Sequence, residues 1–326
     1  MISVIIPTYN RCSVLVRTLE AYGAQDYGRL IREIIIIDDG STDGTAEAVR
    51  ELQKHSKLNI VYMHQDNCGP ARARNRGIAA AGSRLVFITG DDIVPDEGLV
   101  KEHFETHKRF NFDKKIAVLG KVAWPSEIKV TPFMEYINEF GLQFGYSIIP
   151  NADNVPYNFF YTSNISLNRS FLLQDKLFSP KFPHAAWEDC ELGYRLSRRG
   201  LRIVYNRHAV GYHHHAISFS SFRRRQELSG YSACIFASLH PELENWLGIN
   251  REPGMHWRER LKSRLRELYC LFADKFLPFS YPRFYDELMD IHYQRGVKRY
   301  KSETVQLSER MCLGEQRDGG LGPVSK

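Results

Sequence analysis

Short runs of β-branched residues alternate with segments of helical apolar spacing over residues 1–90. The expected strands cover residues 2–7, 31–39, 59–64 and 84–89, and the expected helices cover residues 13–22, 42–55 and 70–81. Four consecutive isoleucines in the second strand indicate burial on both faces, as in a parallel sheet. This order predicts an α/β fold with a doubly wound, mainly parallel sheet flanked by helices.

The pattern beyond residue 110 is less regular. Strand-like segments are expected at 117–124 and 201–206, and helical segments at 132–141, 187–200 and 257–277. The last segment places large apolar residues on one helical face and many arginines and lysines elsewhere. From Lys301 onward the chain has no apolar periodicity, so residues 301–326 are expected to form a disordered tail.

Composition and charge narrow the class of protein. The chain has 326 residues, of which 43% are hydrophobic and 25% charged, as is typical of a soluble globular enzyme. A formal net charge of +6 suits anionic ligands such as phosphates, and no nucleic-acid partner is expected. The cysteines form no CxxC pair, no signal peptide is visible, and no apolar run approaches the roughly 20 residues of a membrane span. We therefore expect a cytoplasmic protein.

Pairs of acidic residues end two of the expected strands. Asp38 and Asp39 close the second strand, and Asp91 and Asp92 follow the fourth. The carboxyl ends of parallel strands form the ligand-binding edge of such a sheet, so the two pairs are expected to converge over one crevice. Adjacent like charges repel, and burial strengthens the repulsion, so each pair needs a partner.

Five segments occur in a fixed order along the chain. They are SVIIPTYNR, IIIIDDGSTDGT, GPARARNRGI, the acidic pair after the fourth strand, and WEDCELGYRL. Together, over residues 1–215, they resemble the family 2 glycosyltransferases, which have the GT-A fold. The resemblance implies transfer of a sugar from a nucleotide diphosphate sugar to an acceptor hydroxyl, with inversion and with Mn²⁺ or Mg²⁺. A carbohydrate, a lipid-linked molecule or a protein could be the acceptor.

The resemblance also suggests a division of the chain. Residues 1–110 would form the nucleotide-sugar-binding half of a GT-A domain, and residues 111–216 its acceptor-binding and catalytic half. Residues 217–300 would form a helical C-terminal extension. Its basic and aromatic segments indicate either packing with a solvated basic face, a homo-oligomer contact, or peripheral contact at the inner face of a membrane.

Two segments are candidates for binding the nucleotide sugar. The turn after the first strand can present backbone N–H groups to a nucleotide, and it consists of Pro7, Thr8, Tyr9, Asn10 and Arg11. The second segment is Asp38 and Asp39, of which Asp38 is expected to contact the base or ribose, and Asp39 to bind the donor while being partly structural. The alternative for both segments is an ordinary turn.

The helix that starts at Pro70 carries Arg72, Arg74 and Arg76. Arginine suits a diphosphate because its forked donors match phosphate oxygens. By match to the family's motif, Arg74 and Asn75 are the candidates for donor binding. The alternative for at least one arginine is a solvated basic face.

Asp91 and Asp92 are the candidates for the metal site. A hard divalent cation takes oxygen ligands, and Mg²⁺ is commonly held by one or two carboxylates together with substrate phosphates. The family usually has Asp-x-Asp here, whereas this chain has Thr89 and Gly90 at the first two positions. Asp91 is also expected to contact the donor. A capped turn is the alternative.

Histidines 213–215 follow a predicted strand, and alternate residues of an extended chain face the same way. His213 is the candidate metal ligand, with His215 second, because imidazole binds metals and related enzymes contribute a histidine after the second acidic motif. A structural or surface histidine is the alternative.

Glu188 and Asp189 begin the predicted helix at 187–200. An inverting transfer needs a base near the acceptor hydroxyl, and the resemblance assigns that role to Asp189, with Glu188 as its catalytic neighbour. Helix capping is the alternative, because the helix dipole favours acids there. Trp187 could wall the acceptor pocket by stacking on a sugar, or it could be a core tryptophan.

Two other functions are compatible with a nucleotide-binding α/β domain. A non-catalytic nucleotide-sugar binder would tolerate the reduced acidic motif at 89–92. A sugar nucleotidyltransferase would share the layout of the sheet, but its Gly-rich GxGTRxxP start is absent from this sequence.

Overall fold

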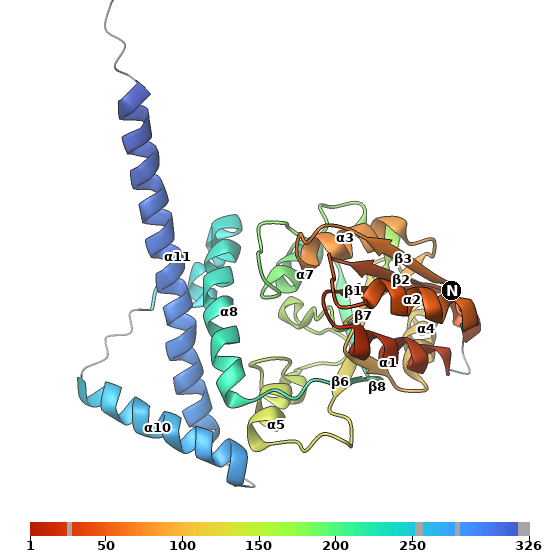
Figure 1. Ribbon diagram of the computed structural model, residues 1–326, viewed down its shortest axis with the longest axis horizontal. Helices are drawn as coiled ribbons and strands as arrows, with labels where there is room; N and C mark the ends of the chain where they lie inside the picture. The colour runs from red at the N-terminus through yellow and green to blue at the C-terminus, as the bar shows by residue number, and fades with distance from the viewer. Residues whose placement is uncertain (25–27, 252–256, 278–280, 319–326) are drawn as a thin grey trace, which may run out of the picture. The chain divides into compact units, whose positions relative to one another are not determined.

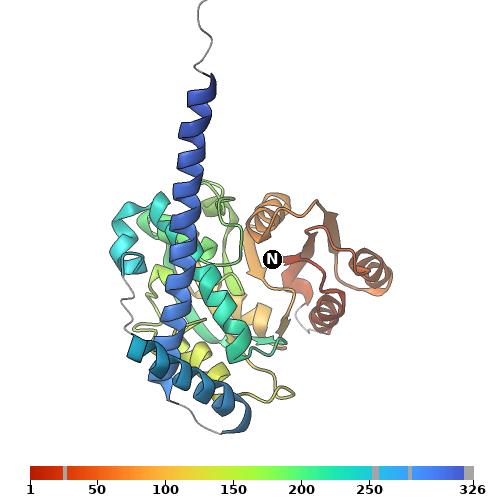
Figure 2. The same ribbon diagram turned by 60° about the vertical axis from the view of Figure 1, so that its left-hand side comes forward.

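The computed structural model describes residues 1–24, 28–251, 257–277 and 281–318. The chain divides into two compact units. One comprises Met1–Phe219 with Phe272–Ser280, and the other comprises Ser220–Leu271 with Tyr281–Lys326. Figures 1 and 2 show the elements of both units.

One mixed sheet forms the centre of the first unit. Within the described residues its strands are β1 (Ile2–Thr8), β2 (Ile31–Asp38), β3 (Ile60–His64), β4 (Leu85–Thr89), β5 (Ile93–Pro95), β6 (Ile116–Ala123), β7 (Asn164–Asn168) and β8 (Arg202–His213). Their order in space is β3-β2-β1-β4-β7-β6-β8-β5. The expected α/β sheet flanked by helices is therefore confirmed.

The direction of the strands changes in the middle of the sheet. β1, β2, β3 and β4 pair in parallel, as expected from their buried β-branched runs. β7 is antiparallel to both β4 and β6, β8 is parallel to β6, and β5 is antiparallel to β8. As a result, the carboxyl ends of β1, β2 and β4 lie at one edge, where β7 begins and β8 ends.

Helices flank the sheet and extend the chain beyond it. Those of the first unit are α1 (Cys12–Gly23), α2 (Thr45–His55), α3 (Pro70–Ala80), α4 (Leu99–Arg109), α5 (Pro132–Glu139), α6 (Arg169–Leu172) and α7 (Glu188–Arg198). The C-terminal helices are α8 (Phe219–Leu239), α9 (Glu244–Leu247), α10 (Trp257–Phe276) and α11 (Pro282–Asp318). None of the helices described combines the length and apolar character that crossing a bilayer requires.

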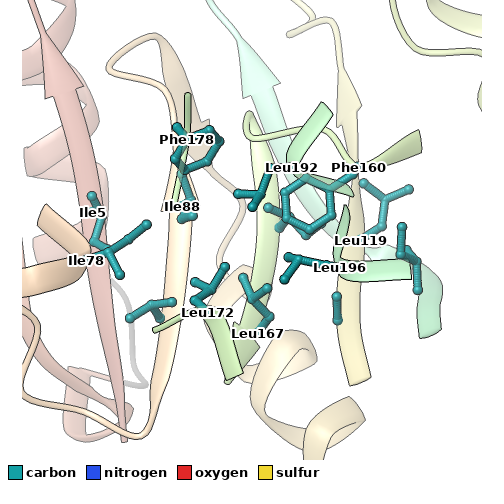
Figure 3. Packing of buried hydrophobic residues seen from close by; sticks show 14 of the residues in the cluster. Ile5, Ile78, Ile88, Leu119, Phe160, Leu167, Leu172, Phe178, Leu192 and Leu196 are labelled. Atoms are coloured by element: carbon teal, nitrogen blue, oxygen red, sulfur yellow. The ribbon is translucent and has the colours of Figure 1, made fainter. Parts of the chain in front are cut away.

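The isoleucines of β2 alternate between two hydrophobic clusters. Ile35 and Ile37 pack in the cluster that contains Ile78 of α3. Figure 3 shows part of this cluster, with Ile78 and with Leu192 and Leu196 of α7. Ile34 and Ile36 pack in the cluster that contains Leu15 of α1. The strand is therefore buried on both faces, and the two clusters fix the pleat that sends Asp38 and Asp39 to the sheet edge.

Two local expectations need correction. Helix α2 begins at Thr45 rather than near Thr42, because Gly44 at its N-cap takes a left-handed φ of 84°. The expected disorder from Lys301 is wrong for residues 301–318, which continue α11. Residues 302–313 contain no glycine or proline, so they extend a helix that has already started. Residues 319–326 lie outside the described residues.

Candidate functional site

Arg11 joins the two aspartates that follow β4. Its Nη1 donates to Asp91 Oδ1 at 3.0 Å and its Nη2 to Asp92 Oδ2 at 2.8 Å. Thr8, the last residue of β1, donates to Asp91 Oδ2 at 2.8 Å. Both carboxylates are buried, whereas 34% of the Arg11 side chain is exposed. The guanidinium thus offsets the repulsion between the neighbouring acids.

His213 reaches the same carboxylates from β8. Pairing of His213 with Ile93 of β5 fixes its position, and its Nε2 lies 3.1 Å from Asp92 Oδ2. The imidazole stacks on Trp124, with ring centroids 5.3 Å apart. Its Nδ1 is buried without a hydrogen-bond partner among the described residues. His215, the second candidate, lies beside His213, with ring centroids 6.0 Å apart.

The surroundings of Asp91 and Asp92 shift the pKa values of their carboxyl groups in opposite directions. Burial raises the pKa of Asp91 to about 6, despite the opposing charge of Arg11. Burial also acts to raise the pKa of Asp92, but the hydrogen bond with His213 and the charges of His213 and Arg11 outweigh it. The pKa of Asp92 is therefore well below its usual value, and Asp92 is the carboxylate that stays ionised.

Thr89 and Gly90, which stand at the first two positions of the family's acidic motif, each have a structural role in this chain. The fully buried Thr89 hydroxyl donates to the Ser163 carbonyl at 2.9 Å, so it ties β4 to the start of β7. A Cβ on Gly90 would lie 2.8 Å from Asp92 Oδ1. The missing side chain leaves room for the Asp92 carboxylate, and the motif retains two acids rather than three.

The donor atoms suit a divalent cation. Asp91 and Asp92 each direct one oxygen at a single positive group, the Arg11 guanidinium. Two carboxylates are ligands that suit Mn²⁺ and Mg²⁺, with phosphates completing the shell, and the adjacent imidazole offers a nitrogen ligand for a transition metal such as Mn²⁺. The part of the chain that the structure describes contains no preformed group of three or more His, Cys, Asp or Glu side chains for a metal. The residues therefore fit a site that a substrate would complete.

Asp38 and Asp39 hold the loops around the end of β2. Asp38 accepts hydrogen bonds from the Ser41 N–H at 2.8 Å and from the Tyr62 hydroxyl at 2.5 Å. Asp39 accepts from the backbone N–H groups of Cys68 and Gly69, just before α3. These bonds give Asp39 the structural role that was expected as part of its function, and donor binding by Asp38 and Asp39 stays a prediction.

The turn after β1 is linked to the turn after β2. Asn10 has a left-handed φ of 50°. Its N–H donates to Ser41 Oγ and its Oδ1 accepts from the Thr42 N–H, both at 2.8 Å. Tyr9 is exposed beside it, and Pro7 lies one residue before the end of β1. These bonds bring residues 7–11 and Asp38 to one part of the sheet edge.

Arg74 and Asn75 point towards the second half of the unit. Arg74 Nη1 donates to the buried Glu188 carboxylate at 2.7 Å. Asn75 exchanges two hydrogen bonds of 2.9 Å with the backbone of Phe178. Burial and the charge of Asp189 raise the pKa of Glu188, against the charge of Arg74. In this structure both α3 residues hold segments of the protein, and their contact with a donor stays a prediction.

Asp189 differs from its neighbour Glu188 in exposure. Its carboxylate is only partly buried and accepts from the Cys190 N–H at 2.8 Å. A second contact, from the Thr162 N–H, is long at 3.5 Å. Trp187, the residue before α7, has a left-handed φ of 69°, which is rare for a large side chain. The strained turn presents Asp189 rather than Glu188 to solvent.

A buried polar cluster behind this edge was not expected from the sequence. His103 and His107 of α4 both lie within 2.9 Å of Ser166 Oγ in β7, and His103 also contacts Asn164 Oδ1 at 2.7 Å. Asn164 Nδ2 donates to the carbonyls of Lys121 and Ala209. The spacing of the histidines, one helical turn apart, was the available signal. The cluster fixes the start of β7 beside Thr89.

Comparison with known proteins places the chain among sugar-transferring enzymes. Residues 3–172 match the family model described as "Glycosyl transferase family 2". A chondroitin synthase of Escherichia coli is 28% identical over 246 residues, which are 65% of this chain and 34% of that protein. A validoxylamine A glucosyltransferase of Streptomyces hygroscopicus subsp. jinggangensis is 26% identical over 65% of this chain and 54% of that protein. The chain thus spans about a third to about half of these relatives.

Solved structures share the fold. The mannosyltransferase PcManGT from Pyrobaculum calidifontis, in complex with GDP-Man and Mn²⁺, has a TM-score of 0.59 at 18% identity, covering 91% of this chain and 85% of that one. Residues 1–349 of S. aureus TarS, in complex with UDP-GlcNAc, have a TM-score of 0.52 at 17% identity, covering 95% and 91%. At these identities the likeness shows the fold alone.

Proposed function

This chain belongs to glycosyl transferase family 2 and has the GT-A fold, and on that premise we propose that it is an inverting enzyme. It transfers a sugar from a nucleotide diphosphate sugar, with a UDP-sugar favoured, to a hydroxyl of a carbohydrate, lipid-linked or protein acceptor. The complexes of PcManGT with GDP-Man and of TarS with UDP-GlcNAc support a nucleotide sugar as donor. We also propose that it acts in the cytoplasm.

The observation that carries the proposal is the convergence of Asp91 and Asp92 on one cationic group at the sheet edge. These carboxylates, with His213, would hold Mn²⁺ or Mg²⁺. A bound cation would neutralise the charge that develops on the leaving diphosphate. Residues 7–11 and Asp38 would bind the nucleotide, because their turns are linked beside the aspartates.

Asp189 serves as the general base. Its partly exposed carboxylate takes the proton of the acceptor hydroxyl as that oxygen attacks the anomeric carbon. The bond from the anomeric carbon to the diphosphate oxygen breaks on the opposite side, so the configuration inverts. Glu188 supports this step by its ion pair with Arg74, which holds the beginning of α7 against α3. Trp187 would wall the acceptor pocket.

Asp189→Asn is the direct test of this function. We expect the variant to retain nucleotide-sugar binding and to lose transfer by at least about 100-fold, because a positioned base contributes that much or more. Binding is measured calorimetrically, and transfer is measured as release of the nucleotide diphosphate. Asp175→Asn, a change of the same kind outside the site, is the control. Near-normal turnover in Asp189→Asn would show that another group is the base.

A non-catalytic nucleotide-sugar binder is the second candidate. It is favoured by Arg11, which holds both carboxylates that a metal would need. Slow hydrolysis of a nucleotide sugar in the presence of Mn²⁺, without acceptor, would rule it out. Nucleotide-sugar binding without any Mn²⁺-dependent hydrolysis or transfer would support it.

A further inference from the structure

Helix α10 exposes a stripe of large apolar side chains. Leu265, Leu268, Phe272 and Phe276 follow one another at spacings of three, four and four residues, which places them on one face. Between 54% and 63% of each residue is exposed. Isolated exposed apolar residues are ordinary, but four in one stripe indicate a surface that contacts something apolar.

Basic residues flank the stripe on both sides. At 100° per residue, Lys262 lies on one side and Arg264 and Lys275 on the other, and all three are exposed. The two acids of residues 262–276 point elsewhere. Glu267 pairs with Arg223, and Asp274 accepts hydrogen bonds from the Thr131 hydroxyl at 2.6 Å and from the Phe219 N–H at 3.1 Å. The solvent-facing side is therefore apolar in the middle and positive at its edges.

Residues of α10 beside and opposite the stripe are held by the protein. Tyr269 packs edge-on against Phe284 near the start of α11, with ring centroids 5.8 Å apart. Arg266 pairs with Glu287 of the same helix. Cys270 and Ala273 are fully buried. Because these contacts fix one face of α10, the orientation of the apolar stripe is set before any partner binds.

We propose that α10 binds the surface of an anionic phospholipid bilayer, with its axis in the membrane plane. The four apolar side chains enter the boundary between headgroups and acyl chains, and the flanking lysines and arginine contact lipid phosphates. A second copy of the chain is a poorer partner. A two-fold contact through this stripe would bring basic flank against basic flank, since Glu267 and Asp274 are turned away. The inference is independent of the sugar-transfer chemistry.

Co-sedimentation of the full chain with vesicles tests the proposal. We expect binding to vesicles of phosphatidylcholine and phosphatidylglycerol, and little binding to phosphatidylcholine alone. The double variant Leu268→Ser with Phe272→Ser should bind the anionic vesicles at least about tenfold more weakly, because it removes two of the four inserted side chains. Neutralising Arg264 and Lys275 with glutamine should weaken binding by about fivefold for each charge.

Matched controls keep the outcome interpretable. Leu173→Ser changes an exposed leucine outside α10 and should leave vesicle binding unchanged. The circular dichroism and melting temperature of each α10 variant should match those of the unaltered protein, because the changed side chains face solvent. Equal binding of all variants, or no binding to anionic vesicles, would overturn the proposal. A lipid-free dimer that the double variant abolishes would also overturn it, in favour of a second copy.

Discussion

At the scale of single residues, the guanidinium of Arg11 lies between Asp91 and Asp92, where the proposed metal ion would bind. Its two nitrogen atoms bind one oxygen of Asp91 and one of Asp92. A divalent metal at the proposed site would therefore compete with a tethered guanidinium. The cost of displacing an arginine from two carboxylates is on the order of 1–3 kcal/mol, which is large enough to measure.

Arg11→Gln should tighten the binding of Mn²⁺ to the nucleotide-free protein by about tenfold, because the competing charge is removed. It should also lower the melting temperature without metal, because two neighbouring carboxylates lose their counter-charge, and added Mn²⁺ should restore it. Free Mn²⁺ is measured by electron paramagnetic resonance. Arg17→Gln, which removes an exposed arginine paired with Glu127, is the control. Unchanged or weaker Mn²⁺ binding in Arg11→Gln would show that Arg11 does not compete with the metal for Asp91 and Asp92.

Gly90→Ala should weaken Mn²⁺ binding by about fivefold to tenfold. The added methyl group would lie 2.8 Å from Asp92 Oδ1, so the carboxylate must turn away from its position beside Asp91 and His213, and a displaced ligand holds the metal less well. Gly98→Ala is a matched control, because the nearest atom to its added methyl, Glu102 Cγ, is 3.9 Å away. Mn²⁺ binding that is equal in both variants would show that Gly90 does not make room for Asp92.

At the scale of elements, the pairing of α4 with β7 depends on polar groups that are out of contact with water. His103 and His107 are fully buried and share the Ser166 hydroxyl. Burial lowers the pKa of His103 to about 4, and burial together with the charges of His103 and Arg84 lowers that of His107 to about 3. Both imidazoles are therefore neutral at neutral pH.

This cluster predicts how stability depends on pH. In the unfolded chain both histidines take up protons near pH 6.5, whereas in the folded protein they do so only near pH 4 and 3. The free energy of unfolding should therefore fall as the pH decreases from about 6.5 to about 4, by up to about 1.4 kcal/mol per pH unit for each histidine. About one pH unit above 6.5, where the histidines of the unfolded chain are also neutral, the cluster should contribute no slope.

Urea unfolding at a series of pH values measures this dependence. His107→Gln should reduce the slope between pH 6.5 and 4, because one buried titrating group is removed. His55→Gln, at an exposed position on α2, should leave the slope unchanged. An identical slope in all three proteins would assign the acid sensitivity to other groups.

At the scale of the whole molecule, the chain combines a GT-A unit built on a mixed sheet with a second unit whose described elements are helices. The family match ends at residue 172, so α7 with Asp189 and the entire second unit lie beyond it. The first unit carries the proposed donor and metal sites. Residues of α10 add a surface that no step of the sugar transfer requires.

A nucleotide sugar that binds only the folded protein should raise its melting temperature. At a ligand concentration about 100 times the dissociation constant, the stabilisation is about 2.7 kcal/mol, which corresponds to a shift of about 5–10 °C for a unit of this size. We expect the largest shift with a UDP-sugar together with Mn²⁺. Differential scanning fluorimetry against UDP-, GDP- and other nucleotide sugars checks this expectation. Asp92→Ala should remove the part of the shift that depends on Mn²⁺, and a shift that persists undiminished would place the metal elsewhere.

Much of the first unit was predictable because its signals are local. The isoleucines of β2, the helical spacing in α1 and Pro70 at the start of α3 each depend on residues close in sequence. The acidic pairs at the ends of β2 and β4 could be placed at one edge, because parallel strands share a direction. β5 and β7 were not predicted, because β5 has only three residues and β7 begins and ends with asparagine, so both are defined by their pairing partners far away in the chain.

The sequence by itself determined the α/β class of the sheet, the edge at which the candidate site lies and the residue types available there. Only the tertiary structure decided which of those residues meet. It brought Arg11 onto Asp91 and Asp92, placed His213 on Asp92 across 121 positions of the chain, and joined Glu188 to Arg74. The physical reason is that strand and helix signals act over a few residues, whereas the partner of a buried charge is set by how distant segments pack.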